Sequence, residues 1–274
     1  MRVIAFIIVC LTGALLLYGT TEFPDWGDPK SPASLHVSNY YIEKTYEDTH
    51  APNFVTAVVT DYRGFDTMFE TAVIFTAGLG CFLLLRDFRE KKEHYYQHIP
   101  TGVILHLKDE KKSLPVGKEF GYMDKEWVPP DLINKTVCRI LIPFIQIYAL
   151  YVVAHGDYSP GGGFQGGVIF GSSLILLAIS YDLKTLVKRI KERLLGIFAA
   201  LGVLIYAGTG VLCLFMGGNF LDYGKLAPLL PGHSDHIRAY GMLVVEIGVG
   251  IAVMAVMTII YINIVSEGRH DEGL

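Results

Sequence analysis

Three acidic side chains lie in segments that are otherwise apolar: Asp66 and Glu70 at the start of one segment, and Glu246 inside another. Asp66 and Glu70 are four residues apart, so a helix places both on one face. Two carboxylates on one face in a medium of low dielectric cannot both ionise cheaply, so one of them is expected to hold a proton. This chemistry suits the loading and release of a proton, or the binding of Na⁺.

Each acid also has a purely structural interpretation. Asp66 could cap the helix that begins there, while Glu70 pairs with Arg63. Glu246 could pair with Arg238, two turns earlier on the same helix. A lone carboxyl inside a membrane costs about 2.5–3.5 kcal/mol even on an insertion scale, so an intramembrane acid is a functional hypothesis by default. Both interpretations stay open at this point.

A glycine-rich stretch joins two hydrophobic segments and reads HGDYSPGGGFQGG over residues 155–167. Irregular backbone at membrane depth must be buried in protein or line a wet cavity. His155 and Asp157 are therefore expected at the lip of a cavity, where a histidine can change charge near neutral pH. A tight turn with a satisfied histidine is the alternative. Three glycines spaced by four give one helix face that permits close packing in lipid, namely Gly163, Gly167 and Gly171.

Metal binding is a weaker interpretation. Residues 232–236 read GHSDH, so His233 and His236 could bind zinc together with His155 and Asp157. A catalytic zinc site needs three protein ligands and an open position, and a polar loop followed by a helix start is the simpler interpretation. We expect no catalytic residue and no metal site. The four cysteines form no C-x-x-C pair and are expected to be buried small hydrophobes.

The composition is that of a membrane protein. Of the 274 residues, 51% are hydrophobic and 18% are charged, whereas soluble domains carry about 25% charged residues. An aromatic content of 12% excludes disorder, and a net charge of −4 argues against nucleic-acid binding. Six segments approach the roughly 20 apolar residues that a spanning helix needs; they cover about 3–19, 66–86, 132–154, 164–181, 194–217 and 238–265.

These spans predict an all-α polytopic protein of the cell inner (cytoplasmic) membrane. The first span could be a signal peptide, but no small-x-small cleavage site follows it, so we expect a retained anchor. Lys and Arg gather in the connections 86–135 and 182–193 and are sparse in 20–65, 155–163 and 218–237. Because positive charge marks cytoplasmic loops, both termini are expected in the cytoplasm.

The chain is expected to divide at its charged, proline-containing stretch. A two-helix part (1–86) precedes a cytoplasmic linker (87–131), and a four-helix part (132–274) follows. Within the linker, residues 103–107 could form a small strand.

The glycine-rich stretch at 155–167 closely resembles the signature of the B subunit of Mrp-type multisubunit Na⁺/H⁺ antiporters and of the matching subunit in membrane-bound hydrogenases. The usual motif reads HGHxSPGGGFQGG, so Asp157 stands where a second histidine commonly lies. This departure puts a role for that imidazole in doubt.

A second resemblance covers residues 53–70, which read NFVTAVVTDYRGFDTMFE. This stretch is similar to the C-terminal portion of the Mrp A subunit, which is a separate small subunit in membrane-bound hydrogenases. The usual form ends DTLGE, so Met68 and Phe69 depart while Asp66 and Glu70 match. The chain therefore looks like a fusion of an A-like segment with a B-like one.

The two resemblances imply a non-redox membrane subunit of a complex that couples Na⁺ and H⁺ movement. They imply no cofactor in this chain, Na⁺ and H⁺ as transported ions, and other Mrp-like antiporter subunits as partners. No long antiporter core precedes the first motif, which favours partnership with hydrogenase or other redox subunits over a stand-alone Mrp antiporter. The implied ion and proton pathway consists of Asp66, Glu70, His155, Asp157 and Glu246.

Two other functions remain open from the sequence. A self-sufficient secondary transporter would be expected to show paired repeats with broken helices, and none is evident. A purely structural linker subunit is the other alternative, because buried acids can also serve only to hold helices together.

Overall fold

The structure is a computed structural model that describes residues 2–85, 94–101, 104–107, 120–123, 132–229 and 236–266. The chain forms two compact units, Met1–Asp48 and Thr49–Leu274.

The first unit is built from helices alone in its described part. A long helix is followed by short turns and a polar helix, in the order α1 (Arg2–Gly19), η1 (Thr20–Glu22), π-helical η2 (Ala33–Val37) and α2 (Ser38–Thr49). None of the spanning window of α1 is buried within the chain. A helix that is apolar all round belongs in a bilayer or inside protein, which accounts for the composition of α1.

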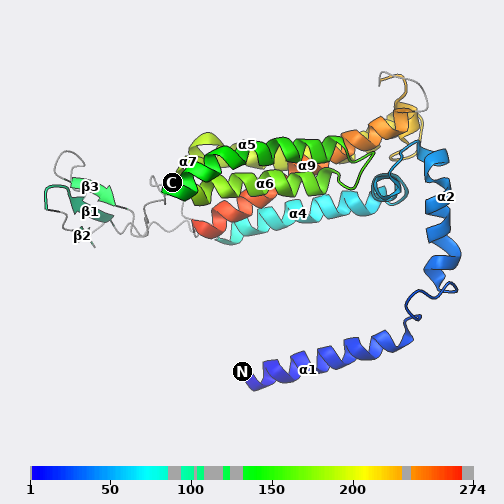
Figure 1. The fold of residues 1–274 in the computed structure, drawn as a ribbon, viewed down its shortest axis with the longest axis horizontal. Coiled ribbons are helices and arrows are strands. Elements are labelled where there is room, and N and C mark those ends of the chain that lie inside the picture. The colour runs from blue at the N-terminus through cyan, green and yellow to red at the C-terminus, as the bar shows by residue number, and fades with distance from the viewer. Residues whose placement is uncertain are drawn as a thin grey trace. The chain divides into compact units, whose positions relative to one another are not determined.

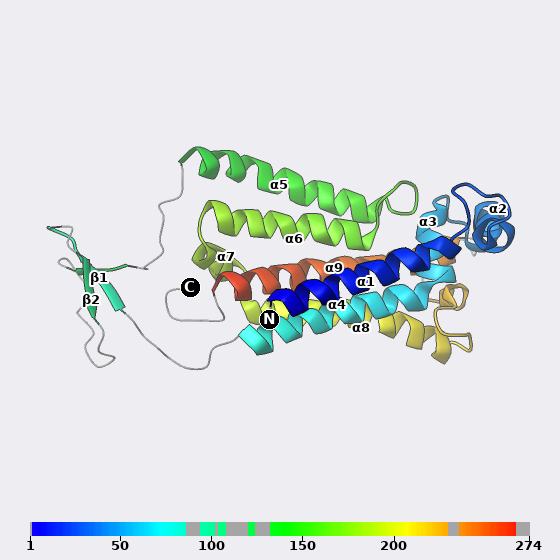
Figure 2. The same ribbon diagram turned by 90° about the horizontal axis from the view of Figure 1, so that it is seen from below.

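The second unit contains a bundle of long helices that run side by side (Figure 1). Figure 2 shows the same helices from below. In chain order its helical elements are α3 (Phe54–Ala57), π-helical η3 (Val58–Tyr62), α4 (Gly64–Leu85), α5 (Leu132–Ala154), α6 (Gly163–Ser180), α7 (Leu183–Arg189), α8 (Glu192–Phe215), η4 (Tyr223–Leu226) and α9 (Ile237–Val265).

Helix α9 is the centre of this bundle, because α4, α6 and α8 all pack against it. The glycine face of α6 meets α9 at very close range. A Cβ atom at Gly167 would lie 2.7 Å from the carbonyl oxygen of Gly250, and one at Gly171 would lie 3.3 Å from that of Met254. A Cβ atom at Gly163 would clash with the backbone carbonyl of Glu246. Only a small-residue face allows two helices to approach this closely.

The described part of the chain contains six helices long and apolar enough to cross a membrane. They coincide with the six predicted spans to within a few residues, so the prediction of an all-α polytopic membrane protein is confirmed. The cytoplasmic location of both termini and the division at 86 and 131 stay predictions. All four cysteines are free, and Cys213 is buried, but Cys10 is exposed, so the prediction of a buried thiol is wrong there.

Residues of the segment between α4 and α5 form a small antiparallel sheet. Its strands are β1 (His94–His98), β2 (Ile104–Leu107) and β3 (Phe120–Met123), in the order β2-β1-β3. Tyr96 lies on the central strand and pairs with Leu105 on one side and Tyr122 on the other. The predicted strand near residues 103–107 is confirmed by β2.

Candidate ion and proton site

The loop between α5 and α6, residues 155–162, turns back onto the helix that precedes it. The backbone N–H of Gly162 donates to the carbonyl of Val152 at 3.2 Å. Gly162 has φ +124°, a conformation that residues with a Cβ atom rarely adopt. The glycines of this loop therefore make a compact turn that sits over the end of α5.

The start of α3 holds this loop from a position about a hundred residues earlier in the sequence. Asn53 caps α3 by accepting from the Val55 N–H at 3.1 Å. Its side-chain amide also donates to the carbonyls of Gly156 at 2.7 Å and Ser159 at 2.9 Å. The Thr56 hydroxyl donates to the same Gly156 carbonyl at 2.8 Å, and the Asn53 backbone N–H donates to the Asp157 carbonyl at 3.0 Å. The loop is thus fixed by the start of α3.

The carboxyl group of Glu246 lies beneath the loop and is 3% exposed. A Cβ atom at Gly156 would lie 2.7 Å from its Oε2, and one at Gly162 would lie 2.9 Å from its Oε1. The two glycines therefore leave room for the Glu246 carboxyl group, and a larger side chain at either position would occupy that room. Glu246 belongs to α9, so the central helix brings this acid to the loop.

Asp157 lies in the same loop and is 8% exposed. Its Oδ1 atom and the Oε2 atom of Glu246 are buried and have no hydrogen-bond partner among the described residues. The two acids also interact electrostatically. Burial raises the pKa of Asp157 to about 6, because desolvation disfavours the charged form. Two buried acids without partners can be stabilised by protonation or by a cation.

His155 does not join this pair. His155 is exposed, and its ring stacks on Tyr151 with ring centroids 4.6 Å apart. The centroid of the Tyr158 ring lies 6.0 Å from that of His155. His155 therefore lies at the outer surface of the loop that covers the two acids.

Asp66 and Glu70 form a second group on α4. As predicted, they share a face, and both side chains are exposed. Arg63 donates to Asp66 at 2.6 Å rather than pairing with Glu70, so the predicted structural alternative for Glu70 is wrong. Arg63, Asp66 and Glu70 line an open pocket of about 460 Å³ on this face, together with three apolar residues, Phe69, Val73 and Ile74.

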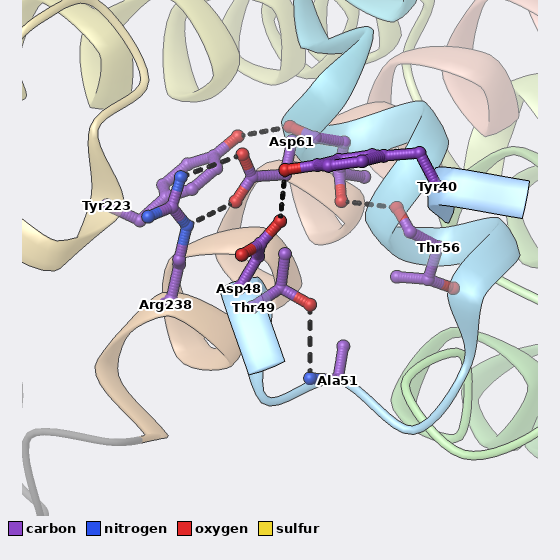
Figure 3. Close-up of polar contacts among 9 residues, drawn as sticks. Tyr40, Asp48, Thr49, Ala51, Thr56, Asp61, Tyr223 and Arg238 are labelled. Carbon is purple, nitrogen blue, oxygen red and sulfur yellow. Dashed lines mark hydrogen bonds and ion pairs between the residues drawn. The ribbon is translucent and has the colours of Figure 1, made fainter. Parts of the chain in front are cut away.

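The suggested pairing of Arg238 with Glu246 is also wrong. Arg238 donates twice to Asp61, from Nε at 2.5 Å and from Nη2 at 3.0 Å. Figure 3 shows this fork, with the Tyr223 ring beside it. The Tyr223 hydroxyl donates to the Thr60 carbonyl at 2.7 Å. The ion pair and this hydrogen bond fix η3, the π-helical segment from which α4 continues.

Sequence reasoning did not find the hydrogen bonds of Asn53, Tyr223 and Tyr206. The Tyr206 hydroxyl donates to the Gly64 carbonyl at 2.9 Å, where α4 begins. An Asn just before a helix signals a cap, but nothing local signals a partner so distant in sequence. Of the two histidines in the zinc alternative, His236 directly precedes α9. The other, His233, lies outside the described residues. Among the described residues, no group of three metal-binding side chains occurs.

Two known protein families match this chain, one in its N-terminal part and one in its C-terminal part. A family described as "Domain related to MnhB subunit of Na+/H+ antiporter" matches residues 133–259, and the family of the E subunit of MBH matches residues 28–98. The B subunit of the Na(+)/H(+) antiporter of Bacillus subtilis (strain 168) is 32% identical over 133 residues, which cover 47% of this chain and 90% of that protein.

Two further relatives extend over both parts of the chain. The A/B subunit of a probable K(+)/H(+) antiporter of Rhizobium meliloti (strain 1021) is 26% identical over 190 residues, which cover 69% of this chain and only 18% of that protein. A chain of the membrane-bound sulfane sulfur reductase, an archaeal respiratory membrane complex, is 26% identical with a TM-score of 0.63; the match covers 96% of this chain and 97% of that one.

The six spans define a multi-pass integral membrane protein. Within that class, the chain belongs to the family of MnhB-type antiporter B subunits, and its B-type domain is fused to an A-like segment that precedes it.

Proposed function

We propose that this chain is a non-redox membrane subunit of a multisubunit complex that couples Na⁺ and H⁺ movement. Its relatives support this proposal, because they are named as Na⁺/H⁺ and K⁺/H⁺ antiporter subunits. The other subunits of such a complex are its partners, and Na⁺ and H⁺ are the ions it helps to move.

The observation that carries the proposal is the buried pair of Asp157 and Glu246. Both acids are more than nine-tenths buried, and each has an oxygen atom without a hydrogen-bond partner among the described residues. A buried polar group without a partner is costly, and two neighbouring carboxylates cannot both ionise cheaply. A proton that leaves when a cation arrives satisfies both conditions, and that exchange is the elementary step of coupled transport.

The remaining predicted pathway residues take roles around this pair. His155 lies at the outer surface of the loop and can pass protons to and from solution. Asp66 and Glu70 provide a second pair of acids on α4. Gly163, Gly167 and Gly171 allow α6 to pack closely on α9, which keeps Glu246 under the loop.

The extent of the match to one relative supports one kind of complex over another. The match to the sulfane sulfur reductase chain covers nearly all of both chains, which supports membership of a redox-driven, hydrogenase-like respiratory complex. The antiporter names of the sequence relatives support a stand-alone Mrp antiporter as the second candidate. Purification in mild detergent separates the two, because iron–sulfur subunits accompany the chain only in the first.

Glu246→Gln tests the proposal in the assembled complex. The amide keeps the shape of the side chain but cannot release a proton. We expect normal assembly and loss of Na⁺-dependent proton movement in membrane vesicles. Glu43→Gln is the matched control, because the same chemical change then falls on an exposed residue of α2. Undiminished transport by Glu246→Gln would remove the buried pair from the pathway.

A further inference from the structure

Glu70 lies in the second turn of α4, one of the helices long and apolar enough to cross a membrane. Helix α4 begins at Gly64, so Glu70 lies about 9 Å further along the helix axis at 1.5 Å per residue. The 22 residues of α4 span about 33 Å, close to the roughly 30 Å of a hydrocarbon core. A bilayer centred on α4 would therefore enclose Glu70, whose side chain is exposed on the surface of the bundle.

This chain offers no basic side chain to Glu70 within its described residues. Glu70 makes no hydrogen bond or ion pair there, since Arg63 pairs with Asp66. Arg238, the basic residue at the start of α9, pairs with Asp61. Helix α1 offers no partner along its span either, because residues 3–19 contain no charged side chain. No basic side chain among the described residues therefore forms an ion pair with Glu70.

The surface around Glu70 is apolar and exposed. Phe65, Phe69 and Val73 are 52%, 60% and 67% exposed and follow one another at a spacing of four residues. This apolar ridge runs beside the pocket that contains Glu70. Arg63 and Asp66 form an ion pair, so Glu70 is the acid of this pocket that has no basic partner among the described residues.

We propose that this face of α4 docks a transmembrane helix of another subunit, and that the docked helix places a Lys or Arg side chain against Glu70. The apolar ridge supplies the contact area, and the acid selects its partner by charge. A charge pair within the membrane is also how intramembrane ionisable residues are usually accommodated. The inference rests on the proposed membership of a complex, and it adds which surface is used and what the partner must carry.

A photo-crosslinking residue at Val73 tests the docking in native membranes that hold the assembled complex. We expect one cross-linked product with another subunit, and a cross-linked peptide that is apolar except for a Lys or Arg. Glu70→Lys should lower the yield by about tenfold or more, because it sets like charges against each other. Changing the identified basic residue to Glu in that background should restore the yield. Glu43→Lys, on α2, should leave it unchanged.

Several results would overturn the inference. Cross-links only to lipid, or only to residues 2–19 of the same chain, would show that no other subunit covers this face. A cross-linked helix without a basic residue, or a yield that ignores Glu70→Lys, would remove the charge pair. The experiment reads contact rather than transport, so its failure is distinguishable from failure of the proposed function.

Discussion

Asn53 provides a sharp test of how the loop over Glu246 is held. Its side chain caps α3 through the Val55 N–H and donates to the carbonyls of Gly156 and Ser159 at 2.7 and 2.9 Å. Asn53→Ala removes these three hydrogen bonds and a fourth, which the amide donates to the Thr56 hydroxyl at 3.1 Å. Loss of a cap costs about 1 kcal/mol, and each hydrogen bond contributes about 1 kcal/mol net. The Gly156 carbonyl keeps the Thr56 hydroxyl as a donor, so we expect the free energy of unfolding to fall by about 2–3 kcal/mol.

A second variant separates the cap from the loop contacts. Asn53→Ser retains a capping oxygen but cannot reach the distant carbonyls, so its cost should be about 1 kcal/mol smaller than that of Asn53→Ala. Denaturant unfolding in detergent measures both. Asn39→Ala is the control, because that amide makes one exposed hydrogen bond to Ser34. If Asn53→Ser matched the unmodified protein, the loop contacts would contribute nothing and the reasoning would be refuted.

Two further predictions concern the charged residues. The pKa of Asp157 is raised to about 6 from its ordinary value of 3.8, so the folded state binds this proton more tightly and stability falls as pH rises between these values. The free energy of unfolding is expected to fall by about 3 kcal/mol over this pH range. Asp157→Asn cannot ionise and should remove this loss. Denaturant unfolding should therefore show the variant more stable, relative to the unmodified protein, at pH 7 than at pH 4. Asp61→Asn removes the carboxylate that accepts from Arg238. Because Arg238 is 36% exposed, we expect a loss of about 2 kcal/mol rather than the 3–5 kcal/mol of a fully buried pair. A double-mutant cycle with Arg238→Gln should give a coupling energy above about 0.5 kcal/mol in size; strict additivity would contradict the pairing.

The six spans could be predicted from the sequence because bilayer thickness fixes the length of an apolar helix. The shared face of Asp66 and Glu70 was equally accessible, since it depends only on helical periodicity. These features follow from local pattern, and no knowledge of the tertiary arrangement is needed to find them.

The candidate site could be predicted only in its parts. Glu246 and Asp157 were each recognisable as acids in unusual places, but their meeting depends on how α9 passes beneath the loop. Arg238 was assigned to Glu246 because both lie on one helix, yet its partner Asp61 is 177 residues away in the sequence. Contacts of this kind are set by packing between helices, which leaves no periodic signal in the chain.

The most direct test of the central claim is proton release from the purified complex when Na⁺ is added in weakly buffered solution. The account predicts that the unmodified complex releases protons and that Glu246→Gln does not, while Glu43→Gln behaves like the unmodified complex. Equal release by the Glu246→Gln complex would contradict the assignment of Asp157 and Glu246 as the exchanging pair.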